Sequence, residues 1–454
     1  MLNRSKLCVT LALLTVIPYA LVAEEDSFAQ GLVIRSPGHV LAQRDRVEPM
    51  NRMLNERLEV LLPQLMSETG IDMWLVLNRE YAEDPVFFTL APQPVFAARR
   101  TTMLVFHDRG DEGFDRLTVN RYPYGDPYES AWEGGDLDEQ WRALGDLIAE
   151  RNPKKIGINV SRHWPVADGL TAGLRDRLME VLTPELQGRV VSAEELVVRW
   201  AETRVSSELE SYPHIVALAR GVISEAFSSR VITPGATTTQ DVAWYIRQRF
   251  HDLGLDPWFQ PSVNAQRAGL ECTAESPFCG TSGVIEPGDV LHTDVGVCYL
   301  YLCTDTQEMG YVTSLGEQGV PAGLKHALAV GNRWQDHLTD SFATGRTGNE
   351  ILASTIAACE AEGIISSTYT HPIGFFGHAP GPTIGMWDNQ GETPVRGDWP
   401  LYPSTAFSTE GNVKVAVPEW EGQHVQIKLE QDAVFDGEAV HYIAGRQTEW
   451  HVVQ

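Results

Sequence analysis

The stretch Leu291–Val312, LHTDVGVCYLYLCTDTQEMGYV, carries two aspartates, Asp294 and Asp305, in strand-like sequence. Around Asp294, side chains of one kind alternate with the period of a half-buried strand, and a second strand-like run leads to Asp305. A reversal of the chain at Tyr299-Leu300 would place the two aspartates directly opposite each other, with Cβ atoms about 4.5–5.5 Å apart. Two carboxylates that close repel each other unless a proton or a cation lies between them. We therefore expect a site for a divalent metal ion here.

The C-terminal segment repeats this arrangement with two glutamates. Alternating apolar residues over 413–417 and 425–429 flank a turn at 418–422, which predicts a hairpin. Its midpoint at Trp420 places Glu410 opposite Glu430. Because glutamates at strand ends are commonly solvated, this pair alone does not indicate a metal site, but together with the two aspartates it does.

A glycine- and proline-rich segment, THPIGFFGHAPGPTIGMWDNQG, covers residues 370–391. This composition predicts a loop with an unusual backbone path. His371 and His378 are its two histidines, and a histidine in such a loop is a good candidate ligand because backbone and solvent can approach closely. Four carboxylates and an imidazole form a donor set that suits two divalent ions, Mn, Fe, Co or Zn.

The chain of 454 residues is long enough for two domains, because single cores rarely grow beyond about 250–300 residues. In residues 24–203 predicted strands alternate with predicted helices, which is typical of an α/β domain. We place the boundary near Arg204, and the second domain at 204–454. The formal net charge of −26 argues against a nucleic-acid partner, whose phosphates would be repelled.

Periodicity gives the individual elements of these two domains. The expected strands of the first domain cover residues 73–77, 103–107, 117–119 and 156–160. The expected helices of the chain include residues 44–69, 136–151, 166–182, 206–227, 239–253 and 347–362.

Residues 1–23 have the pattern of a secretory signal peptide. A basic start with Arg4 and Lys6 precedes an apolar core, and Ala23 is a small residue before two acidic residues. The apolar core is broken by Pro18 and falls short of the roughly 20 residues that a membrane span needs. We therefore expect a periplasmic or secreted protein with no membrane contact after cleavage.

Five cysteines follow the predicted signal peptide, so at least one of them is free or pairs between chains. Cys272 and Cys279 flank one loop and could form a disulfide after export. For Cys298, Cys303 and Cys359 we expect ordinary buried side chains.

In these motifs the sequence resembles the pita-bread metallopeptidases, which include prolidase, aminopeptidase P and methionine aminopeptidase. The ligand order of that family maps onto Asp294 in HTDVG, Asp305 in CTD, His378 in GHAPG, Glu410 in STEG and Glu430 in KLEQD. The resemblance covers about residues 206–451, and the first half of the chain looks like a creatinase-type domain. It implies an α/β creatinase-like N-terminal domain followed by an α+β pita-bread catalytic domain.

The resemblance also implies a role for each ligand. Asp294 would chelate one metal ion, Asp305 and Glu430 would bridge two, and His378 and Glu410 would complete the second. Two divalent ions can hold a hydroxide at neutral pH and polarise a carbonyl oxygen. Glu410 would then accept a proton from the attacking water and later donate it to the leaving amine.

Two family histidines that position the substrate have no evident counterpart in the sequence. Trp387 stands where the second histidine is expected, and the window of residues 253–291 offers Arg267 but no histidine. His371 could supply part of the missing catalytic function, and a packing role in the loop is an equal alternative.

These observations favour an exported dinuclear-metal hydrolase of the prolidase or aminopeptidase P type, with short peptides as substrates. By analogy with relatives of this size we expect a homodimer. The alternative is a metalloenzyme of the same fold that acts on a non-peptide small molecule, as a lyase or as an organophosphate or amide hydrolase. A non-catalytic metal-binding relative is a third interpretation, which the complete ligand set disfavours.

Overall fold

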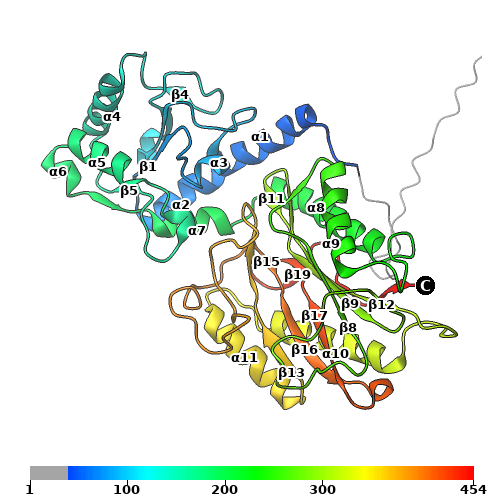
Figure 1. Cartoon of the computed structure of the whole chain (residues 1–454). Helices are drawn as coiled ribbons and strands as arrows, with labels where there is room; N and C mark the ends of the chain where they lie inside the picture. Colours follow the sequence, from blue (N-terminus) through cyan, green and yellow to red (C-terminus); the bar gives the residue numbers. More distant parts are fainter. Residues whose placement is uncertain (1–38) are drawn as a thin grey trace, which may run out of the picture.

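The computed structural model describes residues 39–454, so the predicted signal peptide lies outside the described residues (Figure 1). The chain forms a smaller N-terminal part and a larger C-terminal part (Figure 1). Within residues 39–454, no helix combines the length and the apolar character needed to cross a membrane.

The N-terminal part is built on a six-stranded sheet with strand order β4-β3-β2-β1-β5-β6. β1 runs antiparallel to β2 and parallel to β5. The strands are β1 (Met73–Arg79), β2 (Thr101–Asp108), β3 (Phe114–Thr118), β4 (Glu129–Ser130), β5 (Ile156–Ile158) and β6 (Val190–Ser192). All four strands predicted in this part are therefore present.

Helices surround this sheet and bury its two faces in separate apolar clusters. They are α1 (Val47–Glu56), α2 (Leu62–Thr69), α3 (Phe87–Leu90), α4 (Leu137–Arg151), α5 (Ala172–Val181), α6 (Pro184–Gln187) and α7 (Glu194–Glu202). The helices expected at 44–69 and 136–151 are confirmed, whereas α5 is shorter than the predicted 166–182. A 3₁₀ turn, Pro165–Ala167, takes the place of its first turn.

A π-helical turn, Arg57–Leu61, joins α1 to α2, and the helix ends at Gly70 with a φ of 65°. The turn directs the buried Arg57 toward the C-terminal part, where it binds Glu208 at 3.0 Å. Its guanidinium also lies 4.5 Å from the ring of Phe375, a distance at which a cation is attracted to an aromatic face. Arg204, where we predicted the domain boundary, lies in the short connection between α7 and α8.

The C-terminal part contains four sheets with strand orders β20-β12-β9-β8, β13-β16-β17, β14-β15-β18-β19 and β11-β10-β7. The strands are β7 (Asp256–Pro257), β8 (Ser262–Gln266), β9 (Val290–Val295), β10 (Val297–Tyr299), β11 (Leu302–Cys303), β12 (Thr306–Val312), β13 (Ile365–Thr368), β14 (His371–Ile373), β15 (Thr405–Ser408), β16 (Gly411–Ala416), β17 (His424–Leu429), β18 (Asp432–Phe435), β19 (Val440–Tyr442) and β20 (His451–Val453). Its helices are α8 (Ser206–Ala226), α9 (Thr239–Asp252), α10 (Ala322–Asp340) and α11 (Gly348–Ala361). Three of them lie close to the predicted ranges, whereas α10 was not predicted.

These sheets lie between two pairs of helices (Figure 1). One face of the β8-β9-β12 sheet packs against α8 and α9 through Leu291, Val295 and Val312. Residues on its other face, Val290 and Met309, belong to a second core with α10, α11, β16 and β17. The space between the sheets is therefore enclosed on both sides by helix-supported strands.

The hairpin that contains the two aspartates has a different register from the one we predicted. Thr306 pairs with Val295, and Asp294 lies opposite Gln307, so the direct pairing of Asp294 with Asp305 was wrong. The chain reverses at Leu300 and Tyr301, which both have positive φ values, 54° and 67°. Such angles suit a tight hairpin turn although neither residue is typical of one. Asp305 lies two residues before Gln307 and thus on the same face as Asp294.

The second hairpin has the predicted register, because Gly411 pairs with Leu429 and Glu410 and Glu430 follow at its open end. The cysteine predictions are confirmed only in part. Cys272 and Cys279 form the expected disulfide, and Cys359 is buried and free in the described part of the chain. The expectation for Cys298 and Cys303 was wrong, since these residues face each other across β10 and β11 and form a second disulfide.

Candidate metal centre

Six of the side chains singled out in the sequence converge between the sheets. Their donor atoms form overlapping groups in which all members lie within 4.8 Å of one another. The groups are Asp294–Asp305–Glu430, His371–Glu410–Glu430 and Asp305–His371–His378. Asp305, His371 and Glu430 each belong to two of these groups.

Each carboxylate is placed by a strand or by the segment next to one. Asp294 is part of β9, and Asp305 directly precedes β12. Glu410 lies between β15 and β16, and Glu430 directly follows β17. The backbone amides of Glu430 and Gln307 bond to each other's carbonyl oxygens at 3.2 and 3.1 Å, which brings the two hairpins together.

His371, the first residue of β14, lies at the centre of the carboxylates. Its Nε2 is 3.7 Å from Asp305 Oδ2, 3.7 Å from Glu430 Oε1 and 3.8 Å from Glu410 Oε2. Its Nδ1 lies 3.1 Å from the carbonyl oxygen of Pro372, so Nδ1–H donates and the Nε2 lone pair faces the acids. Burial lowers the pKa of His371 to about 4, which keeps the ring neutral. A neutral imidazole with this orientation is suited to bind a metal ion.

Three buried atoms of this cluster have no hydrogen-bond partner among residues 39–454: Asp294 Oδ1, Asp305 Oδ1 and His371 Nε2. A buried polar atom without a hydrogen-bond partner lowers the stability of the folded state, and three acceptors that face one another lower it further. Burial first, and then the neighbouring carboxylates, raises the pKa values of Asp294, Asp305 and Glu410 well above the usual range. Burial also raises the pKa of Glu430 to about 7. Oxygen and nitrogen acceptors without donors fit a divalent cation.

Gln307 fixes two of the carboxylates and was missed by the sequence analysis. Its amide Nε2 donates to Glu410 Oε1 at 2.8 Å and to Glu430 Oε2 at 2.7 Å. Its Oε1 lies 2.8 Å from Nε2 of His292, whose Nδ1 lies 3.0 Å from the amide nitrogen of Asn264. Gln307 alternates with Asp305 along one strand face, and this spacing could have identified it.

Lys428 is the second residue that the sequence analysis missed. It precedes Glu430 by two positions on β17 and therefore shares its strand face. Burial lowers the pKa of Lys428 to about 8, although the negative charges of Asp294 and Glu410 act in the opposite direction. One lysine cannot neutralise four carboxylates, so the cluster keeps an excess of negative charge.

His378 lies at the solvent side of the cluster. Its side chain is 57% exposed, and its Nε2 is 3.8 Å from Asp305 Oδ2. Its ring centroid is 4.6 Å from that of His371 and 5.0 Å from that of Trp258. Burial, and then the nearby His371, lowers the pKa of His378 to about 4.

Two glycines allow Trp258 to support this histidine. A Cβ on Gly296 or on Gly377 would lie 2.1 Å from an atom of the Trp258 ring. The indole nitrogen of Trp258 donates to the carbonyl oxygen of Thr304 at 2.9 Å, next to Asp305. The glycine of the HTDVG motif is therefore required by close packing.

The structure thus brings together all the residues that we predicted, but it places the two histidines differently. His371, predicted as a catalytic residue, is the buried one among the acids, and His378, predicted as a ligand, lies at the edge. Trp387 is the residue that the sequence places at the position of the second family histidine. It is 58% exposed, and its ring lies 5.6 Å from that of Phe278. Arg267 is paired with Asp289 at 2.6 Å.

Comparison with known proteins agrees with this fold. Residues 212–435 match the model of metallopeptidase family M24. A solved structure of X-Pro aminopeptidase from Thermotoga maritima is 17% identical, with a TM-score of 0.61, over 86% of this chain and 100% of that chain. Xaa-Pro dipeptidase from Bacillus anthracis is 18% identical, with a TM-score of 0.61, over 88% of this chain and 100% of that chain.

A variant of aminopeptidase P from Escherichia coli is also similar in structure, at 11% identity and a TM-score of 0.56. That match covers 87% of this chain and 95% of the other. A sequence search of curated proteins found no match.

The fold and the site define a hydrolytic metallopeptidase with a pita-bread catalytic domain and an additional N-terminal domain. Residues 212–435 match metallopeptidase family M24, as the resemblance in the sequence predicted. Enzymes of this family use divalent metal ions, and the cluster of carboxylates and histidines provides candidate ligands for them.

Proposed function

We propose that this protein is an exported Xaa-Pro peptidase of the prolidase or aminopeptidase P type that acts on short peptides with two divalent metal ions. The observation that carries this proposal is the convergence of four carboxylates and a neutral imidazole, with three acceptor atoms left without donors in the described structure. The names of the similar structures support the choice of X-Pro peptides as the first substrates to test.

The donor groups suggest how the ligands would be shared. Asp294, Asp305 and Glu430 would hold one ion, and His371, Glu410 and Glu430 would hold the other, so that Glu430 belongs to both. This assignment replaces His378 by His371 in the ligand set, because His371 Nε2 faces three carboxylates and His378 Nε2 faces one. Mn, Fe, Co and Zn all suit such donors.

Bound divalent ions would supply a hydroxide at neutral pH and polarise the scissile carbonyl. Glu410 is then the best-placed proton acceptor for the attacking water. Its side chain is 19% exposed, whereas those of Asp305 and Glu430 are 4% and 1% exposed. Gln307 Nε2 holds Glu410 Oε1, which leaves the second oxygen free for a proton. The same carboxyl group can later protonate the leaving amine.

His378 would contact the substrate. Its ring is held at right angles to His371 and Trp258 and presents Nε2 at the solvent side of the cluster. A neutral imidazole in this position can orient the peptide and stabilise the tetrahedral intermediate by a hydrogen bond. The His378→Ala variant should keep its metal and lose kcat, whereas His371→Ala should lose metal; a loss of metal only in His378→Ala would reverse the assignment.

Two disulfides support the proposal of an exported protein. Cys272–Cys279 and Cys298–Cys303 lie in the C-terminal part, and such bonds persist in oxidising compartments such as the periplasm or the extracellular space. The predicted signal peptide would direct the protein there.

The test is an assay of the purified protein, loaded with Mn or Co, on X-Pro dipeptides and X-Pro-X tripeptides. We expect turnover of at least one class, and its loss after chelation. No turnover of any of these peptides, with two metal equivalents bound, would contradict the proposal. Arg267, which the sequence offers in the window of the upstream family histidine, is bound by Asp289 at 2.6 Å and so lends no support to the alternative of a non-peptide substrate.

A further inference from the structure

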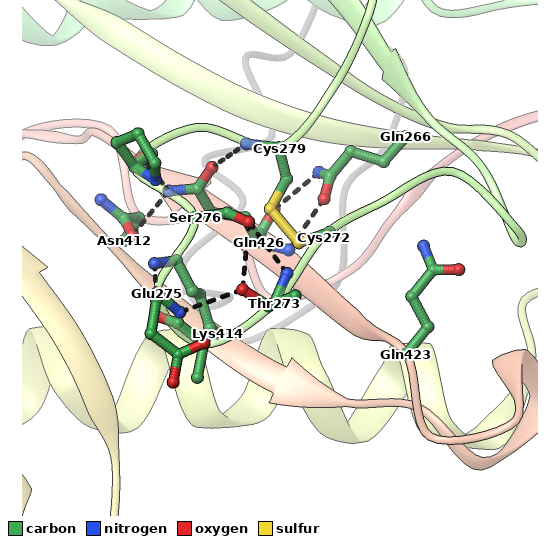
Figure 2. The surroundings of a disulfide bond; sticks show 12 residues. Gln266, Cys272, Thr273, Glu275, Ser276, Cys279, Asn412, Lys414, Gln423 and Gln426 are labelled. Carbon is green, nitrogen blue, oxygen red and sulfur yellow. Dashed lines mark hydrogen bonds between the residues drawn. A yellow bond between two sulfur atoms is a disulfide. The ribbon is translucent and has the colours of Figure 1, made fainter.

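The loop closed by the Cys272–Cys279 disulfide is fastened to the strand that leads to Glu430 (Figure 2). Gln426, a buried residue of β17, accepts a hydrogen bond from the backbone amide of Cys279 at 2.8 Å. Its amide nitrogen donates to the carbonyl oxygen of Pro277 at 3.3 Å and to Asn412 Oδ1 at 2.8 Å. Gln426 thus uses both ends of its side chain to hold the loop.

Further contacts restrain the same loop. Gln266 and Gln426 exchange two bonds of 2.8 Å between side chain and backbone, which ties the end of β8 to β17 (Figure 2). Lys414 Nζ donates to the carbonyl oxygen of Ala274 at 2.8 Å. A loop held at both ends and by a disulfide presents its side chains in a fixed position.

This loop continues the strand face that carries the metal centre. Gln426, Lys428 and Glu430 alternate along β17, so they share one face. The Nζ atom of Lys428 lies 5.7 Å from the ring centroid of Phe278, the residue next to Cys279. Lys428 is therefore near Phe278 and also senses the charges of Asp294 and Glu410.

Phe278 and Trp387 form an exposed aromatic pair beside this lysine. Their side chains are 60% and 58% exposed, although their rings lie 5.6 Å apart. Trp387 lies in a tight turn between Met386 and Asn389, in the loop that begins with His371. Gln390 restrains this turn through two bonds of 2.9 Å to the backbone of Thr368.

We propose that Phe278 and Trp387 form an aromatic subsite for a large apolar or aromatic side chain of a peptide bound at the metal centre, with the Cys272–Cys279 disulfide holding Phe278 in place. The inference rests on the proposed function, which puts the peptide backbone at the acidic cluster. Continuity with that cluster through Lys428 favours substrate as the occupant. Aromatic pairs contribute about 0.5–1.5 kcal/mol beyond their buried area.

The test compares Phe-Pro with Ala-Pro as substrates of the full chain. We expect wild-type protein to favour Phe-Pro, and Phe278→Ala and Trp387→Ala each to reduce the ratio of kcat/KM values about 10-fold. The change should lie in KM, and turnover of Ala-Pro should stay within about 2-fold. The controls are Phe96→Ala and Trp244→Ala, which remove aromatic residues elsewhere that are 80% and 55% exposed, and they should leave the ratio unchanged.

The Cys272→Ser/Cys279→Ser variant tests the role of the disulfide. It should lower the ratio in the same direction as Phe278→Ala, while the Cys298–Cys303 disulfide is kept. If this variant does not fold, the two aromatic variants still test the subsite.

An unchanged ratio in both aromatic variants would overturn the subsite. Self-association that is lost in these variants, together with an unchanged ratio, would assign the pair to an interface between two copies and would also overturn it. If wild-type protein with two metal equivalents bound hydrolyses neither these dipeptides nor X-Pro-X tripeptides, the proposed function fails. Calorimetric binding of Phe-Pro and Ala-Pro to metal-free protein then tests the subsite separately, and equal affinities would overturn it.

Discussion

Buried carboxylates lie on both faces of β12, but only those on one face are paired with positively charged side chains. Glu308 faces α8 and is paired with Arg220 at 2.7 Å and with His451 at 2.5 Å. Its neighbour in the chain, Gln307, faces the other side, where carboxylates stand close to one another with few donors. Burial raises the pKa of Glu308, but Arg220 and His451 outweigh it, so that the pKa falls to about 2.

The difference shows where a cation is required. Both clusters are buried, and both lie on the same strand, so burial alone does not distinguish them. Glu308 is paired with two positive groups of the chain. Within the described residues, the carboxylates around Glu430 have only the nearby charge of Lys428, the amide of Gln307 and the hydroxyl of Ser408, which donates to Glu430 at 2.6 Å. A buried charge without a partner is tolerated only if it is protonated or binds an ion.

The largest effect should come from Glu410→Gln. The change removes the proposed proton acceptor while an oxygen remains for Gln307, and we expect kcat to fall by about 10²–10⁴-fold. Measurement of kcat at saturating metal, together with metal content, checks this. Glu421→Gln is the control, because Glu421 is exposed at the tip of the same hairpin. Activity retained by Glu410→Gln would exclude its role as the base.

A second pair of variants compares the two faces of β12 directly. Glu308→Gln leaves Arg220 and His451 buried without a counter-charge, so we expect it to lower the free energy of unfolding by about 3–5 kcal/mol. Metal binding should be kept.

Asp305→Asn should have the opposite effects on stability and on metal binding. It removes a charge that is repelled by its neighbours, so the metal-free protein should be no less stable, but metal binding should be lost. Urea denaturation of the metal-free proteins and metal titration give both quantities. Equal destabilisation by both variants would contradict the comparison.

The pH dependence of stability should show the Glu308 pair as well. Because the pKa of Glu308 is lowered from an unfolded value near 4.5 to about 2, its contribution is complete above pH 4.5 and is lost as the pH falls toward 2. We expect a loss of roughly 3 kcal/mol over this interval in the wild type. The Glu308→Gln variant should lack this component. Parallel pH profiles of the two proteins would refute the assignment.

A smaller effect is expected for Gln307→Met, which keeps the size of the side chain but removes the amide that holds Glu410 and Glu430. Residues that orient metal ligands typically contribute 10–100-fold in metal affinity or activity. His292→Ala acts on the ligands only through Gln307 and should have a weaker effect in the same direction. Mn²⁺ titration of both variants checks this order, and an effect of His292→Ala that exceeds that of Gln307→Met would reverse it.

Much of this fold could be predicted because its signals are local. Alternation identified the strands, and the register of the hairpin from Glu410 to Glu430 followed from its centre. The register of the hairpin that contains the two aspartates could not be predicted, because Leu300 and Tyr301 adopt positive φ values that their side chains do not indicate. The two aspartates still meet because residues two apart on a strand share a face.

The sequence predicted which residues form the site but not how they are arranged in space. His371 and His378 have similar sequence surroundings, and only the pairing of β14 with β15 places His371 among the acids. Gln307 and Lys428 carry no motif, and their importance follows from the strands that lie beside them. The Cys298–Cys303 disulfide depends on the same unexpected turn.

The central claim is that the acidic cluster binds two metal ions, and anomalous diffraction from crystals grown with Mn²⁺ tests it most directly. The account predicts two peaks about 3.5–4 Å apart, with Glu430 beside both and His371 beside one. Crystals that show no peak among Asp294, Asp305 and Glu430 at saturating Mn²⁺ would contradict it.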